Sequence, residues 1–245
     1  MPETLEKPQF TPEKEIKTPE IKGSREDFEN LLNQLKKNIE RGEYSAIIGD
    51  DFSGRIPTLI IREVIDRVYK SRERKSIKTF FLRPPTDDPM SWELLRQQLP
   101  KNAAKIKTEL KDDKPRVLLV TELVSGGRSI EQLLEALNGQ GLRADVAALE
   151  LANPNNTRFL KMCKDHGANL FYSSGSAGIQ FFMLAHEKEA RPLLKIDIEK
   201  TKKRGRILEI AKIKRGGKPQ EEVIQEREDI NKLSEILFQK VFEKK

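Results

Sequence analysis

The chain has 245 residues, of which 46 are Lys or Arg and 39 are Asp or Glu, so its formal net charge is +7. Its single cysteine excludes an internal disulfide, and its two histidines have no partners at zinc-ligand spacing. No segment approaches the run of ~18 apolar residues that a membrane span requires, so we expect a cytoplasmic protein with no membrane association.

The N-terminal segment, residues 1–23, holds four prolines among many charges and one aromatic residue, Phe10. Such a segment cannot bury enough apolar surface to order itself, so we predict a disordered arm. It also lacks the continuous apolar core of a signal peptide. An amphipathic helix then begins at about Ser24 and ends at Gly42.

Five apolar segments alternate with helical patterns along the next part of the chain. We expect strands at residues 44–49, 77–82, 116–121, 145–151 and 169–173, and helices at 57–71, 89–110, 129–139 and 156–166. This alternation predicts a parallel sheet with helices on both faces. Roughly 170 residues form this core, which is enough for one well-buried domain.

The most informative stretch is the apolar strand that begins at Val117. An acid, Glu122, stands near its end, and a small-residue loop then leads into a helix. The loop residues are Ser125, Gly126, Gly127, Arg128 and Ser129. Backbone N–H groups, a helix N-terminus and glycines together make such a loop an anion site, and an arginine beside a phosphate is favourable. The alternative is an ordinary strand-to-helix turn, where Gly and Ser are also common.

A second unit of the same kind lies upstream. The apolar strand that ends at Gly49 runs through Asp50, Asp51 and the segment Ser53-Gly54-Arg55 into a helix. Pro57 suits the first turn of that helix, where its missing N–H costs nothing. The alternative is again a plain strand-to-helix turn, capped by Asp or Ser.

These two loops, in this order, resemble the ligand-binding segments of type I phosphoribosyltransferases. Thr121-Glu122 occupies the place of the family's acidic pair, and Leu123-Val124 that of its apolar pair. Ser125–Ser129 corresponds to the Thr-x-Gly-x-Thr-like loop that binds the 5′-phosphate of phosphoribosyl diphosphate (PRPP). Ser53-Gly54-Arg55 is similar to the family's pyrophosphate loop, with Gly and Arg in swapped order. Asp50-Asp51 departs from the family pattern, because carboxylates repel pyrophosphate unless a metal lies between.

The resemblance implies a fold and a location for the site. The expected fold is a doubly wound, mostly parallel five-stranded α/β sheet of order 2-1-3-4-5, formed by residues 24–192. The loops at 50–56 and 122–129 are then expected to lie side by side, at the switch point between the first and third strands.

The resemblance also implies a function. PRPP or a related ribose phosphate would bind, and the phosphoribosyl group would pass to a nitrogenous base with release of pyrophosphate. Glu122 is the expected catalytic residue, on the ribose hydroxyls, and Mg²⁺ the expected cofactor, with Asp50, Asp51 and Thr121 as candidate Mg²⁺-linked groups. The alternative is a family-like regulator or partner-binding module that binds ribose phosphates or nucleotides without turnover. A homodimer is compatible with either function, and the acceptor base stays open.

The C-terminal part, residues 193–245, is expected to form a β-hairpin and then a helix over residues 220–243. Nine basic and two acidic residues lie within residues 199–218, so the net charge of this segment equals that of the whole chain. The patch Lys200–Lys218 can attract a polyanion by counterion release. The alternative is a solvated hairpin face, and no aromatic residue is available there to stack on bases.

Overall fold

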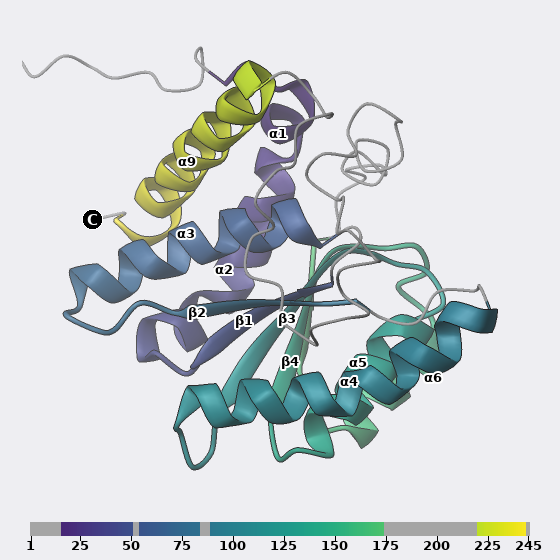
Figure 1. The fold of residues 1–245 in the computed structure, drawn as a ribbon. Helices are drawn as coiled ribbons and strands as arrows, with labels where there is room; N and C mark the ends of the chain where they lie inside the picture. Colours follow the sequence, from purple (N-terminus) through teal and green to yellow (C-terminus); the bar gives the residue numbers. More distant parts are fainter. Residues whose placement is uncertain (1–15, 51–53, 84–88, 174–219, 244–245) are drawn as a thin grey trace, which may run out of the picture.

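A computed structural model of the chain describes residues 16–50, 54–83, 89–173 and 220–243, without the side chains of residues 89–95 and 220–223 (Figure 1). Five strands, all parallel, form one sheet in the order β2-β1-β3-β4-β5. They are β1 (Ala46–Asp50), β2 (Lys78–Leu82), β3 (Arg116–Val124), β4 (Arg143–Leu151) and β5 (Leu170–Tyr172). The expected α/β fold and strand order are confirmed.

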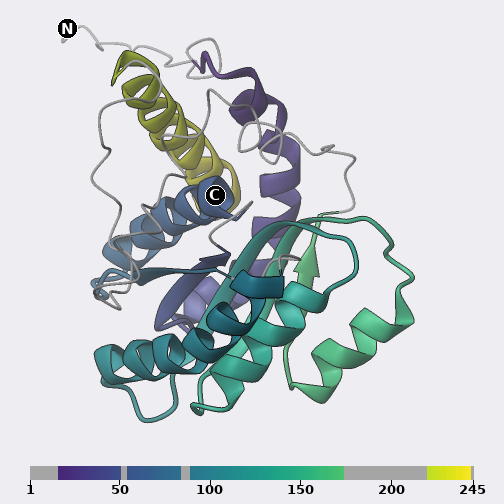
Figure 2. The same cartoon turned by 45° about the vertical axis from the view of Figure 1, so that its right-hand side comes forward.

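Helices cover both faces of this sheet (Figure 2). Two of them, α2 (Arg25–Arg41) and α3 (Arg55–Ser71), pack on one face. The opposite face carries α4 (Pro89–Leu110), α5 (Arg128–Asn138) and α6 (Thr157–Asp165). The four predicted helices between the strands therefore form within two residues of their expected bounds. None of the helices in the described part of the chain is both long and apolar enough to cross a bilayer.

The strands build the core by alternation. In β1, Ile47 belongs to the apolar cluster beneath α2 and α3, whereas Ile48 belongs to the cluster beneath α4 and α5. Successive side chains of a strand point to opposite faces, and both faces are covered here. This double burial explains why the central strands are nearly continuous apolar runs rather than alternating ones.

The N-terminal segment departs from the prediction of a disordered arm over residues 1–23. Residues 19–23 form the short helix α1 (Pro19–Gly23), in which Ile21 is fully buried. Asp229, on the C-terminal helix, accepts hydrogen bonds from the backbone N–H groups of Lys17 (3.1 Å) and Thr18 (2.8 Å). The partner of this segment is more than 200 residues away in the chain, so local composition gave no signal of it. Residues 1–15 lie outside the described part.

The predicted C-terminal helix is present as α9 (Gln220–Phe242). It packs along α3 and α2 and shares one apolar cluster with them, with Leu233 and Leu237 fully buried (Figure 1). This helix therefore thickens the domain on the side of α2 and α3. The expected basic hairpin, including Lys200–Lys218, lies outside the described residues.

A buried polar network joins four segments at the amino edge of the sheet. Asp145, the third residue of β4, is 1% exposed and accepts hydrogen bonds from the Tyr44 hydroxyl (2.9 Å) and the Asn169 N–H (3.0 Å). Its carboxylate also pairs with the guanidinium of Arg116 at 2.8 Å. Burial, reinforced by the charge of Asp145, raises the pKa of the Tyr44 hydroxyl, which stays a donor at all ordinary pH values. This network connects the N-terminal ends of the strands, at the edge of the sheet opposite the candidate site.

A candidate anion and sugar site at the carboxyl edge of the sheet

The two motif loops leave the sheet at the same edge and from neighbouring strands. Strands β1 and β3 are parallel and hydrogen-bonded to each other, and the strand order switches direction between them, with β2 on one side of β1 and β3 on the other. The first loop lies close against β3: a Cβ atom placed on Gly54 would lie 2.5 Å from the backbone oxygen of Val120 in that strand. Glycine is therefore required at position 54. The expected juxtaposition of the two loops is confirmed for their described residues.

Each loop leads into a helix whose N-cap is a glycine. Gly54 precedes α3 and Gly127 precedes α5, and neither helix has a side-chain cap. At α6, in contrast, Asn156 accepts a hydrogen bond from the Phe159 N–H at 3.1 Å. First-turn N–H groups have no intrahelical partner, and the helix dipole adds partial positive charge there. The two neighbouring helix N-termini at the switch point therefore suit an anionic ligand.

The loop between β3 and α5 depends on its second glycine. Gly127 has a φ of +79°, in the left-handed region that side chains disfavour, whereas a Cβ atom on Gly126 would meet nothing within 4 Å. Ser125, Gly126, Arg128 and Ser129 are exposed. Four of the five predicted phosphate-loop residues are thus accessible to a ligand, and Gly127 sets the turn.

Strand β3 is longer than expected, and its two polar residues lie within it. The strand reaches Val124 instead of ending at residue 121, so Thr121 (2% exposed) and Glu122 (4% exposed) are buried strand residues. Side chains of consecutive strand residues point to opposite faces, so these two cannot act as a matched pair on one face. Glu122, in phase with Leu118 and Val120, lies on the face covered by α2 and α3, whereas Thr121, in phase with Val117 and Leu119, lies on the face covered by α4 and α5.

Asp50 ends β1 and is 5% exposed. Its Oδ1 accepts a hydrogen bond from the Gly54 N–H at 3.0 Å, so this carboxylate helps to close its own loop. Because Gly49 pairs with Val120, Asp50 lies at the same level as Thr121 of the neighbouring strand. Asp51 and Ser53 lie outside the described residues.

These oxygen donors match what Mg²⁺ prefers, since Mg²⁺ binds through one or two carboxylates and the phosphates of a ligand. Among the described residues no group of three or more His, Cys, Asp or Glu side chains gathers as a metal cluster. By register, Asp50 and Thr121 lie on the same face of the sheet and Glu122 on the other. The Asp50 carboxylate and the Thr121 hydroxyl therefore fit a Mg²⁺ ion that is held mainly by its ligand rather than by a protein cage.

Arg55 starts α3 and is 8% exposed. Its guanidinium carbon lies 4.8 Å from the centre of the Phe81 ring in β2, a cation–π contact that fixes its orientation. A buried cation at a helix N-terminus opposes the helix dipole, and a bound anion would relieve that opposition.

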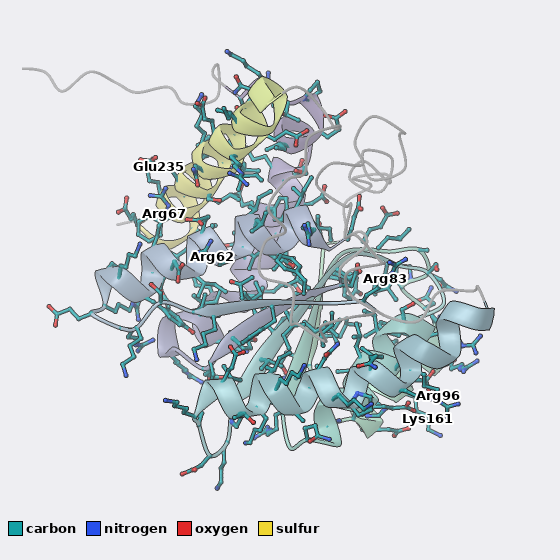
Figure 3. All side chains as sticks on the ribbon, viewed as in Figure 1. Arg62, Arg67, Arg83, Arg96, Lys161 and Glu235 are labelled. Atoms are coloured by element: carbon teal, nitrogen blue, oxygen red, sulfur yellow. The ribbon has the colours of Figure 1, made fainter. Side chains whose placement is uncertain are left out.

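A third strand end adds a cation that sequence reasoning missed. Arg83 directly follows β2, whose last residue Leu82 pairs with Asp50. It is half-buried, and its Nε atom is buried without a hydrogen-bond partner in the described part of the chain. Figure 3 shows Arg83 where β2 ends, whereas Arg62 and Arg67 lie on α3, on the α9 side. The sequence did carry a signal for Arg83, because it is the first residue after a predicted strand, and that strand lies beside the switch point.

Two other basic residues lie elsewhere. The Lys107 ammonium, on α4, donates to the backbone oxygens of Asp112 and Asp113 at the amino edge, far from the loops. Arg128 lines a groove of about 440 Å³ between α4 and α5, together with Arg96. The Arg128 side chain therefore extends along α5, while its backbone N–H belongs to the helix N-terminus.

At the outer end of the same edge, Asp27 of α2 accepts a hydrogen bond from the Ser173 hydroxyl at 2.8 Å, and both residues are buried. Burial raises the pKa of the Asp27 carboxyl above its ordinary value of 3.8, and the Ser173 hydrogen bond offsets part of that rise. This contact ties the end of β5, where the chain continues toward residue 174, to the start of α2.

Asp27→Asn is expected to gain stability relative to the native protein as pH rises. The folded chain keeps the Asp27 proton to a higher pH than the unfolded chain, so its unfolding free energy falls as pH rises from 3.8 through the raised pKa. Asparagine removes this loss and can still accept from Ser173. Urea titrations between about pH 4 and pH 7 measure the difference.

The matched control for this measurement is Asp112→Asn. The Ser45 hydroxyl and the Lys114 N–H lower the pKa of Asp112, so the native carboxylate stabilises the fold above that pKa and loses this effect as pH falls. Between pH 4 and pH 7 the difference between Asp112→Asn and the native protein should therefore stay nearly constant, because the Asp112 pKa does not exceed 3.8 in the folded chain, whereas the difference for Asp27→Asn should change. A parallel change in both would contradict the assignment of Asp27.

Comparisons with known proteins add no relative: no family model, characterised protein or solved structure matches this chain.

Proposed function

We propose that this chain is a phosphoribosyltransferase-like protein that binds PRPP, or a related ribose 5-phosphate, at the carboxyl edge of its sheet. The proposed reaction transfers the phosphoribosyl group to a nitrogenous base and releases pyrophosphate. The observation that carries the proposal is the pair of glycine-capped helix N-termini, at Gly54 and Gly127, on neighbouring strands at the switch point. The resemblance of both loops to the family motifs supports it.

Each part of the ligand has a complementary group. The first N–H groups of α5, at the Ser125–Ser129 loop, suit the 5′-phosphate. Glu122 suits the ribose hydroxyls, which donate hydrogen bonds to carboxylate oxygens. The start of α3, with Arg55 and the neighbouring Arg83, suits the pyrophosphate. Mg²⁺, when bound near Asp50, would neutralise charge on the departing pyrophosphate.

The chemistry needs no covalent intermediate on the protein. The bond between the anomeric carbon and pyrophosphate breaks, pyrophosphate leaves with the electron pair, and a base nitrogen donates its pair to the same carbon. A proton then leaves that nitrogen when the base carried one. Positioning and charge stabilisation supply most of the rate enhancement in such a reaction.

A second candidate function is ribose-phosphate or nucleotide binding without turnover. Two observations favour it. Thr121 stands where the family's first acid belongs, on the opposite side of the sheet from Glu122. Residues 89–110 form the helix α4, whereas the family often carries a flexible basic loop before the PRPP strand. The binder would use the same N–H groups and the same strand ends.

Calorimetric titration of the full chain with PRPP, with and without Mg²⁺, tests both functions. Saturable binding that tightens with Mg²⁺ is expected, because the pyrophosphate and Asp50 are both negative. Release of pyrophosphate with any base from a screened set would then favour the enzyme over the binder. The proposal would be overturned if neither PRPP nor ribose 5-phosphate produced binding heat.

Arg83→Gln is expected to weaken PRPP binding by about tenfold or more, since a charge-assisted hydrogen bond contributes about 1.5–3 kcal/mol. Ribose 5-phosphate, which lacks the pyrophosphate, should bind the variant and the native protein with similar affinity. Lys161→Gln, on α6, makes the same charge change away from the strand ends and serves as the control (Figure 3). Equal losses for PRPP and ribose 5-phosphate would place Arg83 outside the pyrophosphate region.

A further inference from the structure

Phe159, in the first turn of α6, lies against the loop to which the proposed function assigns the 5′-phosphate. A Cβ atom built on Gly127 would lie 2.3 Å from Cδ2 of Phe159, and its three nearest heavy atoms all belong to this ring. Phe159 is 3% exposed and is packed in the apolar cluster beneath α4, α5 and α6. Gly127 therefore rests directly on a fixed aromatic edge.

Phe159 is itself held in place by local hydrogen bonds. Its N–H donates to the side chain of the N-cap Asn156. The segment before α6 is tied to the end of β3, because the Ala152 N–H donates to the Val124 oxygen at 3.0 Å. A longer contact of 3.7 Å joins Arg158 of α6 to Glu131 of α5. The start of α6 is thus connected both to the end of β3 and to the start of α5.

A loop with two consecutive glycines has little conformational preference of its own, since glycine adopts positive and negative φ about equally. The left-handed conformation of Gly127 must therefore be selected by its surroundings. The Phe159 ring occupies the space beneath this residue and restricts the alternatives. Holding a binding loop in one conformation before the ligand arrives lowers the entropy lost on binding.

We infer that Phe159 is a positioning residue for the phosphate loop: its ring holds Gly127 so that the first N–H groups of α5 point toward the carboxyl edge. This inference rests on the proposed function, in which those N–H groups bind the 5′-phosphate. On this inference, α6 influences how tightly the site binds ribose 5-phosphate, although no residue of α6 was predicted to belong to the site.

Phe159→Leu keeps an apolar side chain but removes the ring edge from beneath Gly127. We expect ribose 5-phosphate to bind this variant about tenfold more weakly than the native protein. Met162→Ala is the matched control, because Met162 is also buried in α6 and is not among the atoms nearest Gly127. Its affinity should stay within about twofold of native, at a temperature where circular dichroism shows all three proteins folded.

Hydrogen exchange of the ligand-free protein separates this inference from the proposed function. Phe159→Leu should accelerate exchange of the Glu131 amide, which donates to the Gly127 oxygen at 2.9 Å, relative to both the native protein and Met162→Ala. If the native protein binds no ribose 5-phosphate but exchange accelerates in this way, the proposed function fails and Phe159 remains the support of the loop. Unchanged exchange in Phe159→Leu, or equal effects of both variants, would overturn the inference.

Discussion

Glu122→Gln is expected to reduce PRPP-dependent turnover by about two to four orders of magnitude. Positive charge develops at the anomeric carbon as pyrophosphate departs, and the Glu122 carboxylate would hold the ribose while this happens. Its interaction should therefore strengthen in the transition state and affect kcat more than KM. Glutamine keeps the shape and hydrogen bonding of the side chain but removes the charge. Steady-state release of pyrophosphate, with whichever base the screen identifies, measures the effect.

Glu135→Gln is the control for this measurement, because it removes the same charge from an exposed position on α5. Native turnover that Glu122→Gln leaves intact would defeat the role assigned to this residue, even if ligand binding persists. A native protein that binds ribose phosphates but releases no pyrophosphate with any base would make the non-catalytic binder the better account. In that case only a modest loss of affinity is expected from Glu122→Gln.

The sheet was predictable because its central strands are buried on both faces and carry almost uninterrupted apolar runs. The end of β3 was not, because Glu122 interrupts its run, and an acid within a strand resembles a strand end. The strand continues to Val124 because β4 is equally long and pairs with it as far as Leu151. Strand ends therefore depend on the neighbouring strand as well as on local sequence.

The candidate site was predictable where its parts are local in sequence. The loops around Gly54 and Gly127 carry their own glycines, and the parallel order of β1 and β3 brings them together. Arg83 could not be ranked above other arginines until β2 was known to end beside Asp50. The contact between Phe159 and Gly127 joins residues 32 positions apart and depends on how α6 packs. Helical periodicity predicts that Phe159 is buried, but it does not predict which residue Phe159 contacts.

The same distinction between local and distant partners applies to α1. The prolines and charges of residues 1–23, which include α1, are typical of a disordered segment. Its order comes from Ile21, which is buried against the core, and from Asp229, which receives hydrogen bonds at the start of the helix. One buried apolar side chain and one distant carboxylate thus outweigh a polar composition.

The largest expected loss of stability follows from Asp145→Ala, at the amino edge. The change leaves the Tyr44 hydroxyl and the Asn169 N–H without their acceptor and removes one partner of a largely buried ion pair with Arg116. Arg116 keeps its ion pair with Glu43, so the loss comes mainly from the two buried donors left without an acceptor, at about 1–3 kcal/mol each, which is a large part of the 5–15 kcal/mol typical of a domain. Urea unfolding measures the loss, with the exposed Asp165→Ala as the control.

Asp145→Asn provides a second, milder variant in case Asp145→Ala does not fold. Its amide keeps one acceptor oxygen but loses the charge that faces Arg116, so we expect a smaller loss of about 1–3 kcal/mol. The network lies at the opposite edge of the sheet from Gly54 and Gly127. Folded Asp145→Asn should therefore bind ribose 5-phosphate with native affinity, because distant sites are usually independent. Weaker binding by fully folded protein would show that the amino-edge network also shapes the site, and a loss below about 0.5 kcal/mol would contradict its role in stability.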